Sequence, residues 1–389
     1  MTGALPPAEG PVRVMLCDDS LTARAALSRM LEADAGIRVV ARAGDGRAAL
    51  AAFAAMPAAQ RPEVVLLDLE MPVMDGMTVL PLLLACTPRP AVIVASALTR
   101  RGAAIAMEAL RAGASDVLPK PDAASGGGAF QAELVEKVRG WGRMLRGRAD
   151  RAAARPATAA ESRPAAPDLP RQAPRRAARV LAIGSSTGGP QALAALLRAL
   201  APAPPPVPIL VVQHMPAGFT AMLADHLSRV GALPVAEAVD GSPLRPGRVF
   251  LAPGDHHLLV EAGPEELVAR VTRDPAENFC RPSVDPMLRS LARATAGAAV
   301  ATILTGMGSD GLSGCRALVS AGGRVLAQDE ASSVVWGMPG AVARAGLAEA
   351  LLPPDALAAR LMAGPWDAST GASPVRRGTG PAPLLAAGA

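Results

Sequence analysis

Short apolar runs alternate with longer helix-like runs on both sides of a segment rich in Ala, Arg and Pro, and this alternation constrains the fold more than any other feature of the chain. In the first half the strand-like runs are 12–17, 37–41, 64–67, 91–95 and 116–118, and the helix-like runs are 22–33, 46–56, 76–86 and 103–112. Such β/α steps predict a doubly wound α/β domain with a five-stranded parallel sheet. Its ligand site is expected beyond the carboxyl ends of the strands.

The alternation returns after Val180. Its strand-like runs are 180–183, 209–212, 249–252, 300–304 and 325–327, and they predict a second, mostly parallel α/β sheet between helices. The span 233–273 holds shorter runs separated by Gly and Pro, which indicates an inserted β-hairpin. Because half of the 389 residues are hydrophobic, at least one large core is expected.

The segment between the two halves sets the expected domain boundaries. Helical spacing over 131–145 predicts a helix that closes the first domain, whereas 147–176 is mostly Ala, Arg and Pro without periodicity and predicts a flexible basic tether. The expected organisation is a first domain over 12–130, a closing helix and linker over 131–176, a second domain over 177–364 and a disordered tail over 365–389.

The net charge of +5 is concentrated in the linker. Ten arginines against three acidic residues give 143–179 a charge of +7, which leaves −2 for the rest of the chain. With only 2% aromatic residues there is little to stack on bases, so we expect no nucleic-acid partner. Binding of nucleic acid or an acidic protein by the tether stays open as an alternative, which a steep salt dependence would reveal.

The first residues of the sequence and the spacing of its cysteines predict an intracellular protein. The first residues lack a basic start followed by an apolar core, and no run approaches the roughly 18 apolar residues of a membrane span. We expect a cytoplasmic monomer without membrane insertion. Cys17, Cys86, Cys280 and Cys315 show no CxxC spacing, which favours reduced thiols over a disulfide or zinc site.

Polar residues follow the strands of the first domain. They are Asp18, Asp19, Asp68, Ser96 and Lys120. Clustered carboxylates repel one another unless a divalent cation joins them, and Mg²⁺ prefers carboxylates, waters and phosphate oxygens. The alternative is that these acids cap helices or are solvated.

The first half resembles the receiver domain of two-component response regulators. The resemblance rests on CDDS at 17–20, LDLEMPVMDG at 67–76, Ser96 and Lys120-Pro121. It implies a flavodoxin-like fold in which Asp68 is the phosphoacceptor, Mg²⁺ is held by Asp18, Asp19, Asp68 and the Glu70 carbonyl, and Ser96 and Lys120 contact the phosphoryl group. Val117 stands where receivers usually carry an aromatic switch residue, and the chain has no Tyr.

A glycine-bounded turn, Gly184-Ser185-Ser186-Thr187-Gly188-Gly189, separates a strand-like run from a helix-like run. A helix N-terminus there suits either a phosphate or the oxyanion made when a serine attacks a carbonyl. Ser186, His214 and Asp310 all follow strands of the second sheet, as a serine, its base and an orienting carboxylate would. The turn lacks G-x-G-x-x-G and a Walker lysine, and it matches a lipase elbow only in shifted form. Spacing alone therefore leaves hydrolysis and phosphate binding open.

The second half resembles the catalytic domain of chemotaxis-specific protein-glutamate methylesterases, the CheB family. The resemblance rests on GSSTGG at 184–189, QHMP at 213–216, APGD at 252–255, RPSVD at 281–285, LTGMGSDG at 304–311 and GMP at 337–339. It implies that Ser186 is the nucleophile, His214 the base and Asp310 its partner, with backbone N–H groups of Thr187 and Met307 as the oxyanion hole.

The same resemblance implies what the enzyme acts on. Its substrates would be glutamate γ-methyl esters, with release of methanol, and certain glutamines of methyl-accepting chemotaxis receptors. A chemotaxis histidine kinase would be the phosphodonor, the catalytic domain would need no cofactor, and the role would be sensory adaptation. We hypothesise that the unphosphorylated first domain packs over the Ser186 cleft. The competing hypothesis is an output domain that binds nucleotide or protein without catalysis.

The remaining candidates carry less chemistry. His226 lies in a helical run and is expected to pack or face solvent, and His256 and His257 either line the substrate cleft or make structural hydrogen bonds. Ser283 is expected to be the N-cap of a helix that starts near Val284. Cys280 departs from the resemblance, because the family usually has His at that place.

Overall fold

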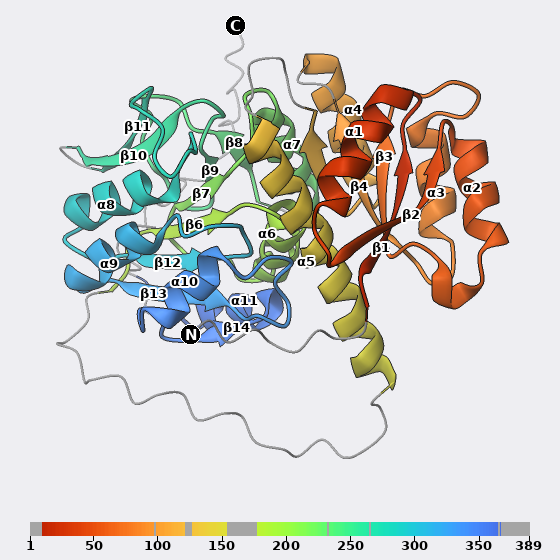
Figure 1. The fold of residues 1–389 in the computed structure, drawn as a ribbon. Coiled ribbons are helices and arrows are strands. Elements are labelled where there is room, and N and C mark those ends of the chain that lie inside the picture. Colours follow the sequence, from red (N-terminus) through yellow and green to blue (C-terminus); the bar gives the residue numbers. More distant parts are fainter. Residues whose placement is uncertain are drawn as a thin grey trace, which may run out of the picture.

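The computed structural model describes residues 10–96, 99–120, 127–153, 177–231, 233–263, 266–364 and Trp366. Most of the expected tether and, except for Trp366, the expected tail lie outside these residues. The described chain forms two α/β domains side by side, with one long helix at their junction (Figure 1).

The N-terminal domain is a parallel sheet with strand order β2-β1-β3-β4-β5. Its strands are β1 (Val12–Cys17), β2 (Ile37–Ala43), β3 (Val64–Asp68), β4 (Ala91–Ser96) and β5 (Asp116–Pro119). Its helices are α1 (Leu21–Glu32), α2 (Gly46–Ala55), the 3₁₀ turn η1 (Ala58–Gln60), α3 (Gly76–Leu84), α4 (Arg100–Arg111) and α5 (Gly127–Ala153). The expected doubly wound five-stranded sheet is confirmed.

Burial follows position in this sheet. All residues of β3 and β4 are buried because helices cover both faces of the sheet, whereas the edge strand β2 alternates between buried and exposed residues. Helix starts follow local capping, since Ser20, Asp45 and Asp75 each accept a hydrogen bond from an N–H in the first turn of α1, α2 and α3. Thr99 caps α4 in the same way, so that helix starts earlier than predicted.

The C-terminal domain is built on a seven-stranded sheet with order β14-β13-β12-β6-β7-β9-β8, and its strand pairings are parallel. The strands are β6 (Leu181–Ser185), β7 (Ile209–Gln213), β8 (Val235–Glu237), β9 (Val249–Leu251), β12 (Val300–Ile303), β13 (Arg324–Gln328) and β14 (Leu351–Leu352). The expected hairpin insertion is confirmed as the separate antiparallel pair β10 (His257–Ala262) and β11 (Leu267–Thr272).

Helices cover both faces of this second sheet. They are α6 (Gly189–Leu200), α7 (Phe219–Gly231), α8 (Val284–Ala294), α9 (Leu312–Ser320), α10 (Met338–Arg344) and α11 (Pro354–Met362). Helix α8 packs against α9 and against β10 of the hairpin, while α6 packs against α7 and α11. Among the described helices, none combines the length and apolarity that crossing a bilayer requires.

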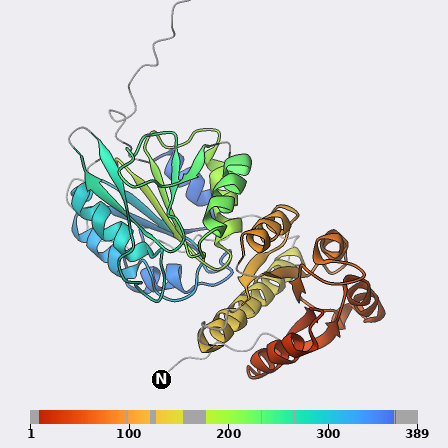
Figure 2. The ribbon, with the colours of Figure 1, turned by 90° about the horizontal axis from the view of Figure 1, so that it is seen from above.

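Helix α5 joins the two domains and continues to Ala153, beyond the predicted end at 145. Viewed from above, it runs along the junction between the two sheets (Figure 2). Its residues Leu134, Val138 and Trp141 share a buried cluster with Val334 of the C-terminal domain. The backbones meet closely there, because a Cβ at Gly140 would lie 2.3 Å from the Val334 carbonyl oxygen.

Candidate functional site

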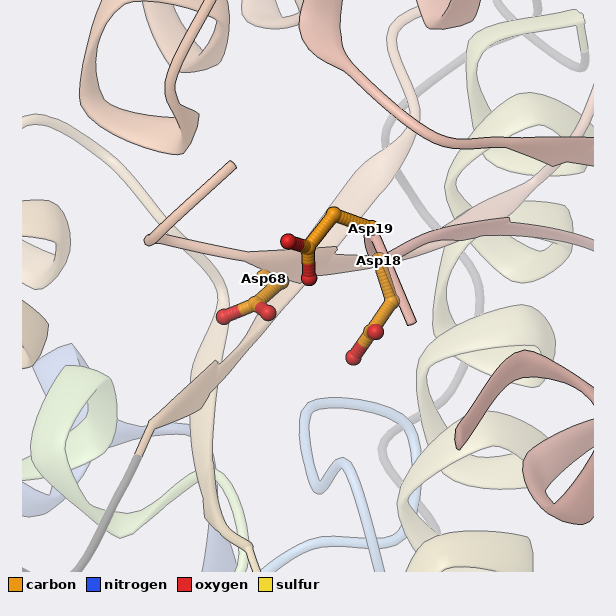
Figure 3. Close-up of side chains that lie close together, drawn as sticks. All are labelled: Asp18, Asp19 and Asp68. Atoms are coloured by element: carbon orange, nitrogen blue, oxygen red, sulfur yellow. The ribbon is translucent and has the colours of Figure 1, made fainter. Parts of the chain in front are cut away.

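An acidic cluster lies at the carboxyl edge of the N-terminal sheet. Asp18 and Asp19 follow β1 and Asp68 ends β3, and each offers a carboxylate oxygen within 4.8 Å of the others (Figure 3). Asp18 and Asp68 are buried and Asp19 is exposed. Lys120, directly after β5, donates from Nζ to Asp68 Oδ2 at 2.6 Å and to Asp18 Oδ2 at 3.1 Å. The structure thus brings together four of the residues that the sequence placed at strand ends.

The charges of this cluster are partly balanced. Burial raises the pKa of Asp68, and the neighbouring Asp18 adds to the rise, while the hydrogen bond from Lys120 opposes it. Burial works against the charge on Lys120, but its two carboxylate partners raise the pKa of the ammonium. Three carboxylates against one ammonium leave an excess of negative charge on oxygen ligands, which fits a hard divalent cation such as Mg²⁺.

Two further residues predicted at this site lie near the cluster. The Glu70 N–H donates to Asp68 Oδ1 at 3.3 Å. Ser96 is buried at the end of β4, where the preceding residue pairs with Asp68, and its hydroxyl donates to the Gly102 carbonyl at 2.8 Å. Its proton is therefore directed to the first turn of α4.

The turn after β6 holds Ser186 by its backbone. Its N–H donates to the Thr305 carbonyl at 3.0 Å, and its carbonyl accepts from Gly189 N–H at 2.8 Å and Gln213 Nε2 at 2.9 Å. Gly188 adopts φ +73°, and a Cβ at Gly189 would lie 1.9 Å from Gln213 Oε1, so both positions require glycine. Ser186 is the half-exposed residue of this otherwise buried turn.

His214 and Asp310 meet at the same edge of the sheet. His214 follows β7, Asp310 lies in the loop between β12 and α9, and His214 Nε2 is 2.7 Å from Asp310 Oδ2. Both side chains are largely buried. A carboxylate in this position fixes the tautomer of the imidazole and stabilises its charged form.

Asp310 is held as an anion at the N-terminus of α8. Its carboxylate accepts from the N–H groups of Val284 at 2.6 Å and Asp285 at 3.1 Å and from the Ser283 hydroxyl at 2.7 Å. Burial would raise its pKa, but the contact with His214 and these donors lower the pKa to about 2. Ser283 is the N-cap residue of α8, as predicted, but its hydroxyl makes no capping bond and bonds to Asp310 instead.

Asn278 is a site residue that sequence reasoning missed. Its Nδ2 donates to Asp310 Oδ1 at 2.9 Å and to Asp285 Oδ2 at 3.0 Å. It lies in an irregular loop with no recognisable spacing to Asp310, so only the fold brings the two together.

The third side chain of the predicted triad is not joined to the other two. Among the described residues, Ser186 Oγ has no hydrogen-bond partner, and His214 Nδ1 lies 3.5 Å from the Cys280 thiol. Burial disfavours the charged imidazole, yet hydrogen bonds to Asp310 and Cys280 raise the pKa of His214 to about 10. In its protonated form this imidazole cannot accept the serine proton.

Ser186 and His214 line one cavity of about 530 Å³, and residues of both domains contribute to its wall. Thr187 and Met307 line it as well, and within the described part of the chain their N–H groups have no hydrogen-bond partner. The N-terminal domain contributes β5 and α5 to its wall, through Asp116, Val117, Ala132, Glu133 and Lys137. Val117, which stands where receivers usually carry an aromatic residue, is buried.

A buried ion pair joins the N-terminal domain to the turn after Ser186. Asp116 Oδ1 lies 3.1 Å from Lys137 Nζ, and Asp116 Oδ2 accepts from the Gly188 N–H at 3.1 Å. Lys137 also donates to the Val117 carbonyl, and although burial opposes its charge, Asp116 and Glu133 raise the pKa of its ammonium. We name Asp116, Lys137 and the Gly188 N–H the interdomain latch.

The other histidines lie outside this cavity. His257 bonds to the Pro275 carbonyl and to the Ser283 N–H, and His256 bonds to the Gly254 carbonyl, so both make structural hydrogen bonds. His226 lies half-buried on α7, where burial and the nearby arginines Arg111 and Arg198 lower its pKa.

Comparisons with known proteins bear on both domains. The family described as CheB methylesterase matches residues 181–361, and the response regulator receiver domain matches residues 14–125. A protein-glutamate methylesterase/protein-glutamine glutaminase of Azospirillum brasilense is 50% identical over 367 residues, which cover 88% of this chain and 90% of that protein. The protein-glutamate methylesterase/protein-glutamine glutaminase 1 of Paramagnetospirillum magneticum is 47% identical, and the match covers 92% of this chain and 97% of that protein. The Thermotoga maritima CheB methylesterase catalytic domain, known from a crystal structure, is 39% identical in sequence. The match covers 48% of this chain and 99% of that domain, with a TM-score of 0.47.

Proposed function

Because the chain belongs to the CheB methylesterase family and is a protein-glutamate methylesterase/protein-glutamine glutaminase with a receiver domain, we propose that it demethylates and deamidates chemotaxis receptors under the control of its own phosphorylation. The proposed substrates are glutamate γ-methyl esters and specific glutamines of methyl-accepting receptors, and the proposed role is sensory adaptation. The proposed phosphodonor is a chemotaxis histidine kinase.

Ser186, His214 and Asp310 are the proposed catalytic residues. Since His214 Nε2 is bound to Asp310, its Nδ1 must take the proton of the Ser186 hydroxyl. The serine oxygen attacks the ester carbonyl, and the N–H groups of Thr187 and Met307 stabilise the oxyanion. Methanol leaves with the proton that His214 held, and water then releases glutamate from Ser186. With glutamine the leaving group is ammonia.

The receiver is proposed to hold this machinery in an inactive arrangement. The interdomain latch holds β5 and α5 of the receiver against the turn that carries Ser186. Residues of these two elements also form one wall of the cavity. Asp68 is the proposed phosphoacceptor, and Asp18, Asp19, Asp68 and the Glu70 carbonyl would hold Mg²⁺. The ion, when bound, would supply positive charge beside the incoming phosphoryl group. Lys120 and Ser96 would then contact the phosphoryl oxygens and shift the population toward an open enzyme.

The observation that carries the proposal is the His214–Asp310 pair at 2.7 Å, whose imidazole lines the same cavity as Ser186. Methanol release from methylated receptor membranes tests it, with wild type and Ser186→Ala compared in the presence and absence of a small-molecule phosphodonor. Wild type should release methanol faster with the donor, and Ser186→Ala should release none. Equal release by the two proteins would refute the assignment. Failure of a serine-directed acylating probe to label Ser186 would favour a non-catalytic binding domain.

A further inference from the structure

The loop between β11 and α8 presents a thiol to the catalytic imidazole. Glu277 and Cys280 exchange two backbone hydrogen bonds, of 3.1 and 2.9 Å, which close a tight turn. Phe279 at the tip is fully exposed, while Cys280 points inward and lines the 530 Å³ cavity. Its Sγ lies 3.5 Å from His214 Nδ1, a normal distance for a hydrogen bond to sulfur.

The nitrogen that this thiol contacts is the one that catalysis needs. An imidazole has two ring nitrogens, and Asp310 occupies Nε2. Nδ1 must therefore serve Ser186, yet in this structure it faces Cys280. Cys280, His214 and Asp310 have the arrangement of a nucleophile, a base and an orienting carboxylate, with the sulfur against the ring nitrogen that the serine would have to reach.

We propose that Cys280 is a modification site, where the thiol gives its proton to the His214 imidazole that it contacts and the sulfur reacts with peroxides and with alkylating agents, and that its modification stops hydrolysis. The effect on hydrolysis rests on the proposed roles of Ser186 and His214, whereas the reactivity of the thiol does not. A neighbouring imidazolium stabilises a thiolate, which is the reactive form of cysteine.

The reaction with hydrogen peroxide balances as a two-electron oxidation. The Cys280 thiolate attacks one peroxide oxygen, the S–O bond forms, and the O–O bond breaks. The hydroxide that leaves becomes water with the proton of the His214 imidazolium, and Cys280 becomes a sulfenic acid. One added thiol converts the sulfenic acid to a mixed disulfide and water, and a second restores the Cys280 thiol and leaves as the disulfide of the reductant.

The other three cysteines lack this setting. Cys17 and Cys315 are buried, and burial raises the pKa of both thiols, that of Cys17 to about 12. Cys86 is partly exposed like Cys280, but its thiol donates to the Leu82 carbonyl at 3.4 Å and burial raises its pKa. Cys86 is therefore a matched internal control for accessibility without an imidazole.

Modification would block catalysis by occupying the space beside Nδ1. A sulfenic oxygen or a carboxamidomethyl group on Sγ lies between the loop and the ring, where the Ser186 hydroxyl has to approach. A hydrogen bond from the sulfenic acid would also hold His214 in the arrangement that excludes the serine.

Alkylation of the full-length protein tests the thiol directly. Iodoacetamide is applied at pH 6.5, and the carboxamidomethylation of Cys280 and Cys86 is followed by mass spectrometry. Cys280 should react at least about tenfold faster than Cys86, and His214→Gln should remove most of this difference. Equal alkylation rates for Cys280 and Cys86 in the wild-type protein would overturn the proposal. A Cys280 alkylation rate that is the same in wild type and in His214→Gln would overturn it as well.

Peroxide treatment tests the effect on hydrolysis. Wild type should lose most of its methanol release after hydrogen peroxide and regain it with dithiothreitol, whereas Cys280→Ser should keep its own untreated activity. Dithiothreitol does not reverse methionine oxidation, so recovery separates Cys280 from the nearby Met215 and Met307. An equal loss of methanol release in Cys280→Ser would overturn the proposed effect of Cys280 modification on hydrolysis. Absence of methanol release by untreated wild type would count against the proposed function and leave the alkylation result standing.

Discussion

The receiver site and the esterase site occupy the same place in their domains, the carboxyl edge of a parallel sheet, but they are assembled to different degrees. In the receiver, Lys120 already bridges Asp18 and Asp68. In the esterase, Asp310 and His214 are joined, while Ser186 stands apart and His214 faces Cys280. Under the proposed function, the receiver site is thus assembled in a state in which the esterase site is not yet complete.

The largest expected effect comes from the part of the esterase site that is already assembled. Asp310→Asn removes the carboxylate that orients His214 and should lower kcat for demethylation by about 10⁴-fold. Phosphorylation of Asp68 should be unchanged, which phosphoprotein quantification after donor treatment can check. A loss of both functions would mean that the two sites are not separable in the way the comparison requires.

The latch should have the next largest effect. The double variant Asp116→Ala/Lys137→Met removes the contact with Gly188 without leaving a buried lysine unpaired, and it should raise methanol release without phosphodonor by about tenfold, the effect of losing roughly 1.4 kcal/mol of closed-state preference. Glu108→Gln, an exposed carboxylate of α4, is the matched control and should release methanol like wild type. An unchanged rate in the latch variant would show that these contacts do not restrain the enzyme.

A smaller effect should appear in the pH dependence. His214 can act as a base only after it loses its proton, so activity should rise with pH through the raised pKa of this group. Cys280→Ala removes one of the contacts that stabilise the imidazolium and should move the acidic limb of the kcat/KM profile to lower pH, with the limb of wild type as the reference. A limb that stays in place would show that Cys280 does not influence His214.

The smallest expected effect concerns the stability of the receiver. Because Asp18, Asp19 and Asp68 place negative charges close together, saturating Mg²⁺ should raise the midpoint of receiver unfolding by a few degrees, as expected for about 2 kcal/mol of binding linkage. Differential scanning calorimetry of wild type and Asp19→Asn would measure it. An equal shift in both proteins would place the ion elsewhere.

The strand-end residues of both sites were predictable from the sequence. Parallel strands bring their carboxyl ends to one edge, so Asp18, Asp68 and Lys120 were expected at one edge of the first sheet, and His214 and the loop of Asp310 at one edge of the second. The strand and helix pattern of the sequence could not predict how loops and domains pack against one another. Asn278 reaches Asp310 through an irregular loop, and the Asp116–Gly188 contact exists only because the receiver is seated on the esterase.

Two local predictions differ from the structure for identifiable reasons. Ser283 is at the N-cap as expected, but the Asp310 carboxylate is a stronger acceptor than a hydroxyl, and it accepts from the first N–H groups of α8 in place of Ser283. Helix α5 runs to Ala153 although the apolar periodicity ends near 145, because Ala and Arg are strong helix formers and extend a helix that is already nucleated.

The proposed restraint of Ser186 by the receiver can be tested without any receptor. The measurement is the rate at which a fluorophosphonate acylates Ser186 in the full-length protein, with and without Mg²⁺ and a phosphodonor, in wild type and in Asp68→Asn. Acylation of wild type should accelerate by about tenfold on phosphorylation, while Asp68→Asn should stay at the slow rate. A wild-type rate that phosphorylation leaves unchanged would contradict the account.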